Sequence, residues 1–226
     1  GEWRTPFNPR SSNHRNDDYC EGTAWQWTWF VPHQIDGLVE LMGGREGFIN
    51  KLDSLFTADS SLEGEMTSAD ISGLIGQYAH GNEPSHHIIH MYNYVDQPYK
   101  TQELVDSVLH TLYFNDPNGL SGNEDCGQMS AWYLFTCMGF YPVSPASGEY
   151  AIGAPQFPEF SICMGGDRTK ILCIKAKNLS EKNKYVKSVS VNGKRLKAPV
   201  LKHEDIKDGG VIVFEMVDKP ATFGNK

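Results

Sequence analysis

The sequence GNEDCGQMSAW occupies residues 122–132, and the other polar clusters of the chain can be interpreted as partners of this turn. Two carboxylates, Glu124 and Asp125, stand between two glycines, directly before a helical run that Gly139 should end. An acidic turn at the start of a helix repels anions, whereas its carboxylate and amide oxygens suit hydroxyl groups, water and cations. We therefore expect this turn to bind a hydroxyl-rich ligand or a hard cation.

Charge and aromatic residues are unevenly distributed along the 226 residues. Residues 1–147 carry 19 acidic and six basic side chains and all five Trp, whereas residues 148–226 carry nine acidic and 14 basic side chains. This asymmetry predicts two structural units. An acidic, aromatic-rich unit lacks the basic footprint that nucleic acid requires, and it suits a neutral polyhydroxylated ligand. No apolar run reaches the length of a membrane span, so we expect no membrane segment.

Helical spacing of apolar residues dominates the first part of the chain. It predicts a helix over 34–42, a break at Gly43-Gly44 and a second helix that buries Phe48 to Phe56. Further helices are expected at 84–95, after a cap at Thr101, and at 128–137, while 57–80 should be a polar connection with one short element at 71–75. Helix pairs joined by polar loops suit a toroid of helical hairpins.

The period changes after Gly148. β-Rich runs occupy residues 159–163, 171–176, 186–191 and 211–216, and Asn192-Gly193 is the strongest hairpin signal in the chain. The sequence therefore predicts a mainly α chain followed by a small antiparallel β unit.

Three polar clusters, at residues 19–22, 81–87 and 122–127, each place a carboxylate beside a glycine, where backbone and ligand can approach closely. Glu21 is either a helix-start acid or a general acid whose pKa is raised by the water-excluding rings of Tyr19, Trp25 and Trp27. Glu83 and Asp125 are likewise either first-turn acids or functional groups. In the functional interpretation, Asp125 takes a proton from water on the face of a sugar opposite Glu21.

Metal chemistry is restricted by the kinds of ligand present. Adjacent His86 and His87 point in different directions on a helix, and the zinc spacing H-E-x-x-H is absent. We therefore expect two of the three residues His86, His87 and His90 to form hydrogen bonds and one to be packed. The five Cys form no CxxC pair, and their odd number leaves at least one thiol free. A hard cation fits the oxygen donors better; these are Asn82, Glu83, Asn123 and Asp125.

The three clusters, in this order, resemble signature blocks of glycoside hydrolase family 92, the exo-acting α-mannosidases, many of them α-1,2-specific. Residues 31–33 (VPH) and 139–143 (GFYPV) fit the same pattern, and the likeness extends from about residue 4 to residue 160. The resemblance implies inverting, calcium-dependent hydrolysis of terminal α-mannosides of glycans, as in N-glycan degradation. It also implies a secreted, periplasmic or cell-surface location for the full-length protein.

The resemblance implies a fold as well. The family combines an N-terminal β-sandwich with an (α/α)6 barrel, so residues 1–147 would be the last helices of that barrel and residues 148–226 a β-rich C-terminal portion. The sandwich and the remaining barrel helices would then be supplied by the same polypeptide outside this chain. We expect the chain alone to be inactive or nearly so.

By motif position, the resemblance gives Glu21 the role of general acid and Asp125 that of general base. Asn123 stands where many members have an acid, so the base works either alone or with Glu124. The implied calcium ligands are Asn82 and Glu83. The implied substrate-binding residues are Trp25, Gln26, His86, His87 and Gln128.

Two alternatives remain at this point. The chain could be a non-catalytic, calcium-dependent carbohydrate-binding module that uses the Trp cluster. Release of product from mannosides would exclude this alternative. It could also be a plain helical domain in which the aromatic residues form the core and the acids cap helices. The plain domain does not explain three ordered clusters at glycine-flanked turns.

Overall fold

The computed structural model describes residue 2 and residues 5–222. Contacts between residues divide the chain into two compact units, each made of two segments. The first unit comprises Gly1–His86 and Leu112–Cys126, and the second comprises His87–Thr111 and Gly127–Lys226.

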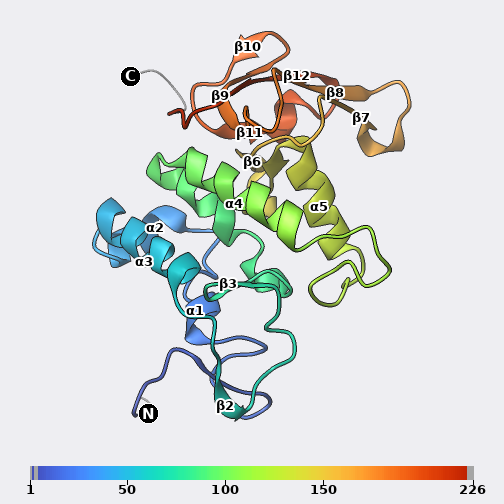
Figure 1. Cartoon of the computed structure of the whole chain (residues 1–226). Helices are drawn as coiled ribbons and strands as arrows, with labels where there is room; N and C mark the ends of the chain where they lie inside the picture. Colours follow the sequence, from blue (N-terminus) through green and yellow to red (C-terminus); the bar gives the residue numbers. More distant parts are fainter. Residues whose placement is uncertain (1, 3–4, 223–226) are drawn as a thin grey trace. The chain divides into compact units, whose positions relative to one another are not determined.

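The first unit is organised around a helical hairpin, α2 (Ile35–Leu41) and α3 (Arg45–Thr57), shown in blue in Figure 1. Gly43 and Gly44 join the two helices with φ angles of 85° and 90°, a conformation that glycine adopts without a steric penalty. Helix α3 turns an apolar face inward, so both predicted helices and the break between them are confirmed. Its buried residues are Phe48, Leu52 and Leu55.

Short elements complete the first unit. The single-turn α1 (Ala24–Trp27) follows the polar cluster at residues 19–22, and the 3₁₀ helix η1 (Glu83–Ser85) lies in the cluster at residues 81–87. The sequence predicted only a polar connection with one short element between residues 57 and 80, and this was incomplete. The segment forms strands too short to show an alternating pattern: β2 (Glu63–Met66) pairs in parallel with β1 (Ser11–Asn13), and β3 (Leu74–Ile75) pairs with β4 (Tyr78–Ala79).

The second unit contains three helices before its sheets: η2 (Ile88–Val95), α4 (Pro98–Thr111) and α5 (Gln128–Met138). Helix α5 ends as predicted at Gly139, whose φ is 94°. Two predictions were wrong. Thr101 is no cap, because α4 already begins at Pro98 and the Thr101 hydroxyl donates to the Ile89 carbonyl oxygen at 2.9 Å.

The predicted helix over 84–95 was the second error, because the segment forms η1 and then the 3₁₀ helix η2 instead of one α-helix. All residues of η2 except Tyr94 are buried. Packing on all sides therefore determines this backbone, and a one-face helical pattern cannot describe it.

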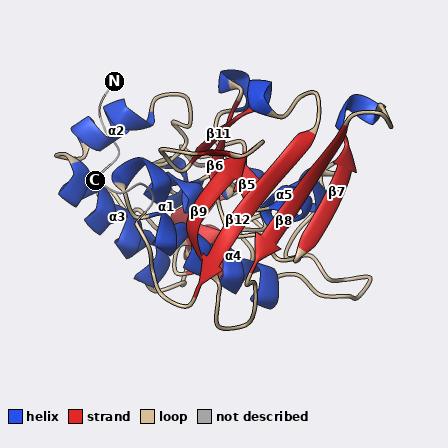
Figure 2. Ribbon diagram, turned by 90° about the horizontal axis from the view of Figure 1, so that it is seen from above, coloured by secondary structure: helices blue, strands red, loops and turns tan. Residues whose placement is uncertain are grey.

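Two sheets fill the rest of the second unit. The three-stranded sheet has the order β11-β6-β5 and consists of β5 (Phe140–Tyr141), β6 (Glu149–Ile152) and β11 (Val200–Lys202). The five-stranded sheet has the order β10-β9-β12-β8-β7. Its strands are β7 (Glu159–Cys163), β8 (Ile171–Lys177), β9 (Tyr185–Val191), β10 (Lys194–Arg195) and β12 (Gly210–Val217). Figures 1 and 2 agree that the five-stranded sheet lies over α4 and α5 of the same unit.

The prediction of an antiparallel β unit was wrong in one respect. Strand β12 lies between β9 and β8, antiparallel to β9 and parallel to β8, so the sheet is mixed (Figure 2). Local turn signals report hairpins between neighbouring strands, but they carry no information on a later strand that inserts between two earlier ones. The hairpin itself is confirmed: β9 pairs with β10 across Asn192 and Gly193, both with positive φ.

The core of the second unit lies between the sheets and α5, and includes Phe140, Ile152, Ile174, Val189 and Phe214. In the part of the chain that the structure describes, no helix has the length and apolar character that crossing a membrane requires.

Candidate active site

The first unit brings together the predicted acid, the predicted base and the two predicted calcium ligands. The Asn82 side-chain amide donates to the backbone oxygen of Glu21 at 2.7 Å. The carboxyl group of Glu83 forms a hydrogen bond with that of Asp125. Three segments that lie far apart in the sequence thus meet at Asn82-Glu83.

Close backbone approach explains why the turns at residues 81–83 and 122–125 meet. A Cβ atom added to Gly122 would lie 2.5 Å from the Gly81 carbonyl oxygen, and one added to Gly81 would collide with the Ser72 hydroxyl. Only residues without a side chain fit at both positions. The two glycines therefore bring the segment that carries Asp125 against the segment that carries Glu83.

The backbone at the candidate acid and base is unusual. Glu21 has a φ of 50°, Asp125 a φ of 50° and Cys126 a φ of 56°. A non-glycine residue rarely adopts this left-handed conformation, and such positions concentrate at active sites, where the surrounding structure maintains the strain. The conformation is most unfavourable for Glu21 and Cys126, because Asp tolerates it better.

Helix α1 fixes the turn that carries Glu21. Thr23 caps the helix: its hydroxyl accepts from the Trp25 backbone N–H at 3.2 Å, and its own N–H donates to Gln26 Oε1 at 2.6 Å. Gln26 also donates through Nε2 to the Gln77 carbonyl oxygen at 2.5 Å, so the oxygen and the nitrogen of its side-chain amide both form hydrogen bonds within the fold. Trp27 Nε1 donates to the Cys20 carbonyl oxygen at 2.8 Å, directly before Glu21.

Glu83 has the most perturbed environment of the three acids. Burial raises the pKa of Glu83, and the negative charge of Asp125, the hydrogen bond with Asp125 and the charge of Glu21 raise it further, while a backbone hydrogen bond opposes the shift. Its Oε1 atom is buried and has no hydrogen-bond partner in the described structure. A buried acceptor of this kind is satisfied by a proton donor or by a cation.

Buried histidines support the same turn. His86 Nε2 lies 3.0 Å from the His80 backbone oxygen, and because a carbonyl only accepts, Nε2 carries a proton. His80 stacks on His86 with a ring separation of 4.9 Å. The two ring nitrogens of His80 each lie 2.8 Å from a hydroxyl, one from Tyr78 and the other from Tyr113. Burial, followed by the charge of His86, lowers the pKa of His80 well below its usual value. No sequence signal predicts this Tyr-His-Tyr chain, because Tyr113 lies 33 residues from His80 and shares no motif with it.

The exposure of the predicted residues varies. Glu21, Asn123 and Asp125 are exposed, and Glu124 and Trp25 are half-buried, with Lys51 Nζ 4.3 Å above the Trp25 ring. His87 and Gln128 belong to the second unit: His87 is buried, and Gln128 Nε2 donates to the Tyr141 hydroxyl at 3.3 Å.

Asn82 and Glu83 are the candidate calcium ligands in the first unit. Asn82 and Glu83 offer oxygen atoms, and the buried, unpartnered Glu83 Oε1 is suited to a hard cation. Among the described residues, however, no group of three or more His, Cys, Asp or Glu side chains could hold a metal ion. These two residues thus fit a hard cation, but they supply only part of the six to eight oxygens that calcium takes.

Two exposed acids, a half-buried carboxyl group and an amide thus meet in the first unit. The model of the glycosyl hydrolase family 92 catalytic domain matches residues 1–218. The chain belongs to glycoside hydrolase family 92.

Solved family 92 structures agree with this assignment. A family 92 α-mannosidase from Bacteroides thetaiotaomicron in complex with mannoimidazole is 43% identical, with a TM-score of 0.88 over 97% of this chain and 29% of its own. A family 92 inverting mannosidase from the same organism is 36% identical, with a TM-score of 0.80 over 97% of this chain and 30% of its own.

A curated relative gives the same picture. A protein from Arthroderma benhamiae described as an uncharacterized secreted glycosidase is 27% identical over 216 residues, which are 95% of this chain and 26% of the relative. The chain thus spans less than one third of the length of the family 92 relatives named here.

Proposed function

We propose that the chain forms part of an exo-α-mannosidase that removes terminal α-linked mannose from glycans with inversion of configuration. The observation that carries the proposal is the meeting of Glu21, Asn82, Glu83 and Asp125 in a chain of family 92. It is supported by the mannoimidazole bound to one relative and by the inverting activity named for another. By analogy with many family members, α-1,2 linkages and N-glycan degradation are the proposed context.

In the proposed reaction, the Glu21 carboxyl group protonates the glycosidic oxygen as the bond to the anomeric carbon breaks. Asp125 accepts a proton from a water molecule that attacks the anomeric carbon from the opposite face. The products are mannose of inverted configuration and the shortened glycan. Glu21 is exposed in this chain, so the proposal requires that other parts of the full-length protein or the substrate itself exclude water from it.

The neighbours of the base have supporting roles in the proposal. Asn123 has an amide where an acid is common in the family, and an amide cannot share a proton with Asp125 as an acid would. Glu124 is the second carboxylate proposed to assist the base. Both lie in the turn that close contact between Gly81 and Gly122 fixes.

We assign Asn82 and Glu83 to a calcium ion. A bound calcium ion supplies oxygen coordination sites for sugar hydroxyls. Glu83 contributes its buried Oε1 atom, and Asn82 contributes its side-chain oxygen while its amide nitrogen holds the backbone of Glu21.

Further residues are proposed to contact the substrate. Trp25 offers an aromatic face for a sugar ring, and Gln26 orients the turn before it. His86, whose Nε2 donates to the His80 backbone oxygen, is the histidine that the family resemblance assigns to substrate binding in the first unit. The roles of His87 and Gln128 in substrate binding stay predictions from the family resemblance, because both residues belong to the second unit.

The proposal extends to the whole protein. Residues 1–147 would contribute the last helices of an (α/α)6 barrel and residues 148–226 a β-rich portion, with the other barrel helices and a β-sandwich supplied by the rest of the polypeptide. A secreted, periplasmic or cell-surface location follows from the family and agrees with the secreted relative.

The experiment that tests this function follows the anomeric form of the first mannose released from α-1,2-mannobiose by the full-length protein, using proton NMR. An inverting enzyme releases β-mannose, which then mutarotates to the equilibrium mixture. Initial release of α-mannose would contradict the inverting mechanism. Absence of any hydrolysis with calcium present would contradict the function itself.

A further inference from the structure

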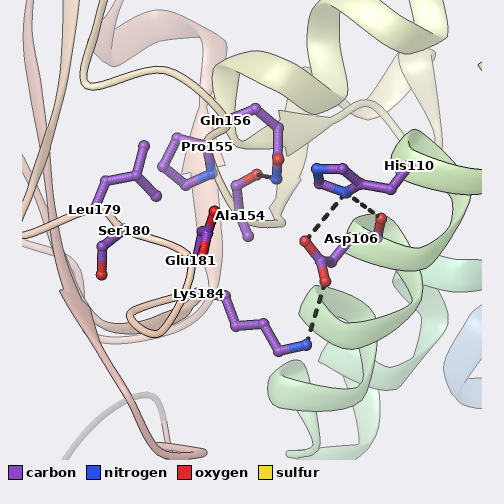
Figure 3. Close-up of a pocket in the computed structure, with 9 residues that line it drawn as sticks. All are labelled: Asp106, His110, Ala154, Pro155, Gln156, Leu179, Ser180, Glu181 and Lys184. Atoms are coloured by element: carbon purple, nitrogen blue, oxygen red, sulfur yellow. Dashed lines mark hydrogen bonds and ion pairs between the residues drawn. The ribbon is translucent and has the colours of Figure 1, made fainter. Parts of the chain in front are cut away.

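The second unit contains a cavity of about 520 Å³ that the proposed reaction does not use. Its walls come from α4, from the segment after β6 and from the loop between β8 and β9, all within this unit (Figure 3). This volume lies within the range of small-molecule binding sites. Polar and charged side chains form much of its lining.

One side of the cavity is held in place by Asp106. His110 Nδ1 lies 2.8 Å from the Asp106 backbone oxygen, so this nitrogen carries a proton and Nε2 keeps a lone pair whenever the ring is neutral. The carboxylate of Asp106 lies 3.3 Å from the same nitrogen and 3.2 Å from Lys184 Nζ. Figure 3 shows these contacts as dashed lines. The three side chains therefore form a connected, oriented polar wall.

Hydrogen-bonding capacity remains around this wall. An ammonium group has three N–H donors, and Lys184 uses one of them on Asp106. Gln156 donates from Nε2 to the Ala154 carbonyl oxygen at 3.2 Å, which leaves its Oε1 as an acceptor. Glu181 is exposed and forms no ion pair in the described part of the chain. Donors and acceptors thus both line the cavity, which also contains the apolar ring of Pro155 (Figure 3).

We propose that this cavity is an accessory site that binds one neutral pyranose ring of the glycan substrate. The carboxylates of Asp106 and Glu181 outnumber the single lysine, which disfavours phosphate and carboxylate ligands. Hydroxyl groups both donate and accept, so they can use the donors and the acceptors of the lining, and the C–H face of a pyranose can pack on Pro155. The choice of a mannose-containing glycan rests on the proposed function.

An accessory site changes how the protein interacts with a polymer. When one ring of a polysaccharide is held at a second site, other chain ends of the same molecule stay at a high effective concentration. The site therefore predicts stronger retention on α-mannan than the affinity for a single mannose ring would give. Methyl α-mannoside measures the affinity for a single ring, and α-mannan measures retention on the polymer.

The test uses the full-length protein in affinity electrophoresis through α-mannan, with methyl α-mannoside binding measured by calorimetry. Glu181→Gln and Gln156→Ala remove an acceptor from the cavity, and Glu149→Gln is the control, because Glu149 is an exposed acid of β6 outside the cavity. We expect both cavity variants to weaken retention on mannan at least fivefold. Their melting temperatures and their hydrolysis of an aryl α-mannoside should match the wild type.

The outcomes separate this inference from the proposed function. Retention unchanged by both cavity variants, or weakened equally by Glu149→Gln, would overturn the accessory site even if mannosides are hydrolysed. Retention that depends on Glu181 in a protein that hydrolyses no mannoside would instead overturn the proposed function and leave the binding site standing.

Discussion

Glu83 lies among the groups to which the reaction is assigned. Its carboxyl group forms a hydrogen bond with Asp125, and its neighbour Asn82 donates to the backbone oxygen of Glu21; burial, followed by the charges of Asp125 and Glu21, raises the pKa of Glu83. A half-buried carboxyl near two other acids binds a proton more readily than an isolated one. The calcium ion proposed for Asn82 and Glu83 would relieve the repulsion among these acids.

The two catalytic assignments predict different substrate dependence. In the full-length protein, Glu21→Gln should abolish hydrolysis of disaccharides but retain more activity on aryl mannosides, because an activated leaving group needs less protonation. Asp125→Asn should reduce the rate roughly 100- to 10,000-fold with either leaving group, since water activation is lost in both cases. Steady-state rates on α-1,2-mannobiose and an aryl mannoside measure the difference.

Matched controls separate these effects from a general loss of charge. Glu65→Gln changes an exposed acid of β2, and Asp116→Asn changes an exposed acid in the same loop as Asp125. Both should leave the rates unchanged. Equal losses on the two substrates for Glu21→Gln would contradict its role as the acid.

Calcium dependence is predicted from Asn82 and Glu83. Treatment of the full-length protein with EGTA should remove activity, and added calcium should restore it, because EGTA would remove the calcium ion proposed for Asn82 and Glu83. Added magnesium is the control and should not restore activity, because this ion requires a smaller and more regular coordination shell than calcium. Activity that is indifferent to both treatments would count against the metal assignment.

His90 makes the protein sensitive to acid. It is fully buried, neither ring nitrogen has a hydrogen-bond partner in the described structure, and burial, with the charge of His87 as a smaller cause, lowers the pKa of His90 to about 3. An unfolded histidine titrates near pH 6.5. Between these values the unfolded state binds the proton and the folded state does not, so stability should fall as the pH decreases, by up to about 1.4 kcal/mol per pH unit.

His90→Phe should reduce this slope, because phenylalanine does not titrate and can keep the stacking contact with Tyr141. Urea unfolding at several pH values between 6.5 and 4 measures the slope. His33→Phe, at an exposed histidine, should leave it unchanged. A slope that is the same in His90→Phe as in the wild type would show that other groups cause the acid sensitivity.

At the scale of elements, Gly139 terminates α5 and meets the core of the five-stranded sheet. Its φ is 94°, and a Cβ atom there would lie 2.8 Å from Phe214 Cζ and 3.0 Å from Pro155 Cδ. Gly148 also has a positive φ, 68°, but a Cβ atom there would meet nothing within 4 Å.

The pair therefore separates backbone strain from crowding. Gly148→Ala should cost only the strain, about 1 kcal/mol, whereas Gly139→Ala should cost roughly 1–3 kcal/mol more, because it also overpacks the core. Chemical denaturation of the two variants provides the comparison. Equal costs would mean that Phe214 moves aside without penalty.

The elements that the sequence predicted are those with a strong local pattern. Helices α2, α3 and α5 and the hairpin at Asn192 follow from spacing, from glycine stops and from an Asn-Gly turn. Helix η2 and strand β12 in its central position depend on packing from all sides and on pairing between distant segments, which no local pattern records.

The candidate site divides in the same way. Its residue types and glycine-flanked turns could be predicted from the sequence, because Glu21, Glu83 and Asp125 occur in recognisable clusters. Their spatial arrangement could not be predicted, because the hydrogen bond between Glu83 and Asp125 and the contact between Gly81 and Gly122 each join segments about 40 residues apart. Such contacts exist only after folding.

At the scale of the whole molecule, the chain corresponds to 29% of the length of a family 92 α-mannosidase that it resembles. If the rest of such a protein encloses the exposed Glu21 and Asp125, the 226-residue chain alone should have little activity. Hydrolysis of α-1,2-mannobiose by this chain should then fall below that of the full-length protein by a factor of about 100 or more, as loss of an enclosed, positioned site implies. Equal turnover would show that the two units suffice.

The central position of β12 has a consequence for synthesis in the cell. A ribosome makes β7, β8, β9 and β10 before β12, yet β12 separates β8 from β9 in the finished sheet. Until β12 has left the exit tunnel, β8 and β9 each have one unpaired edge. Unpaired strand edges promote association with neighbouring nascent chains. A stop codon just upstream of Gly210 would therefore yield a polypeptide that recruits chaperones or aggregates, although it removes none of the proposed catalytic residues.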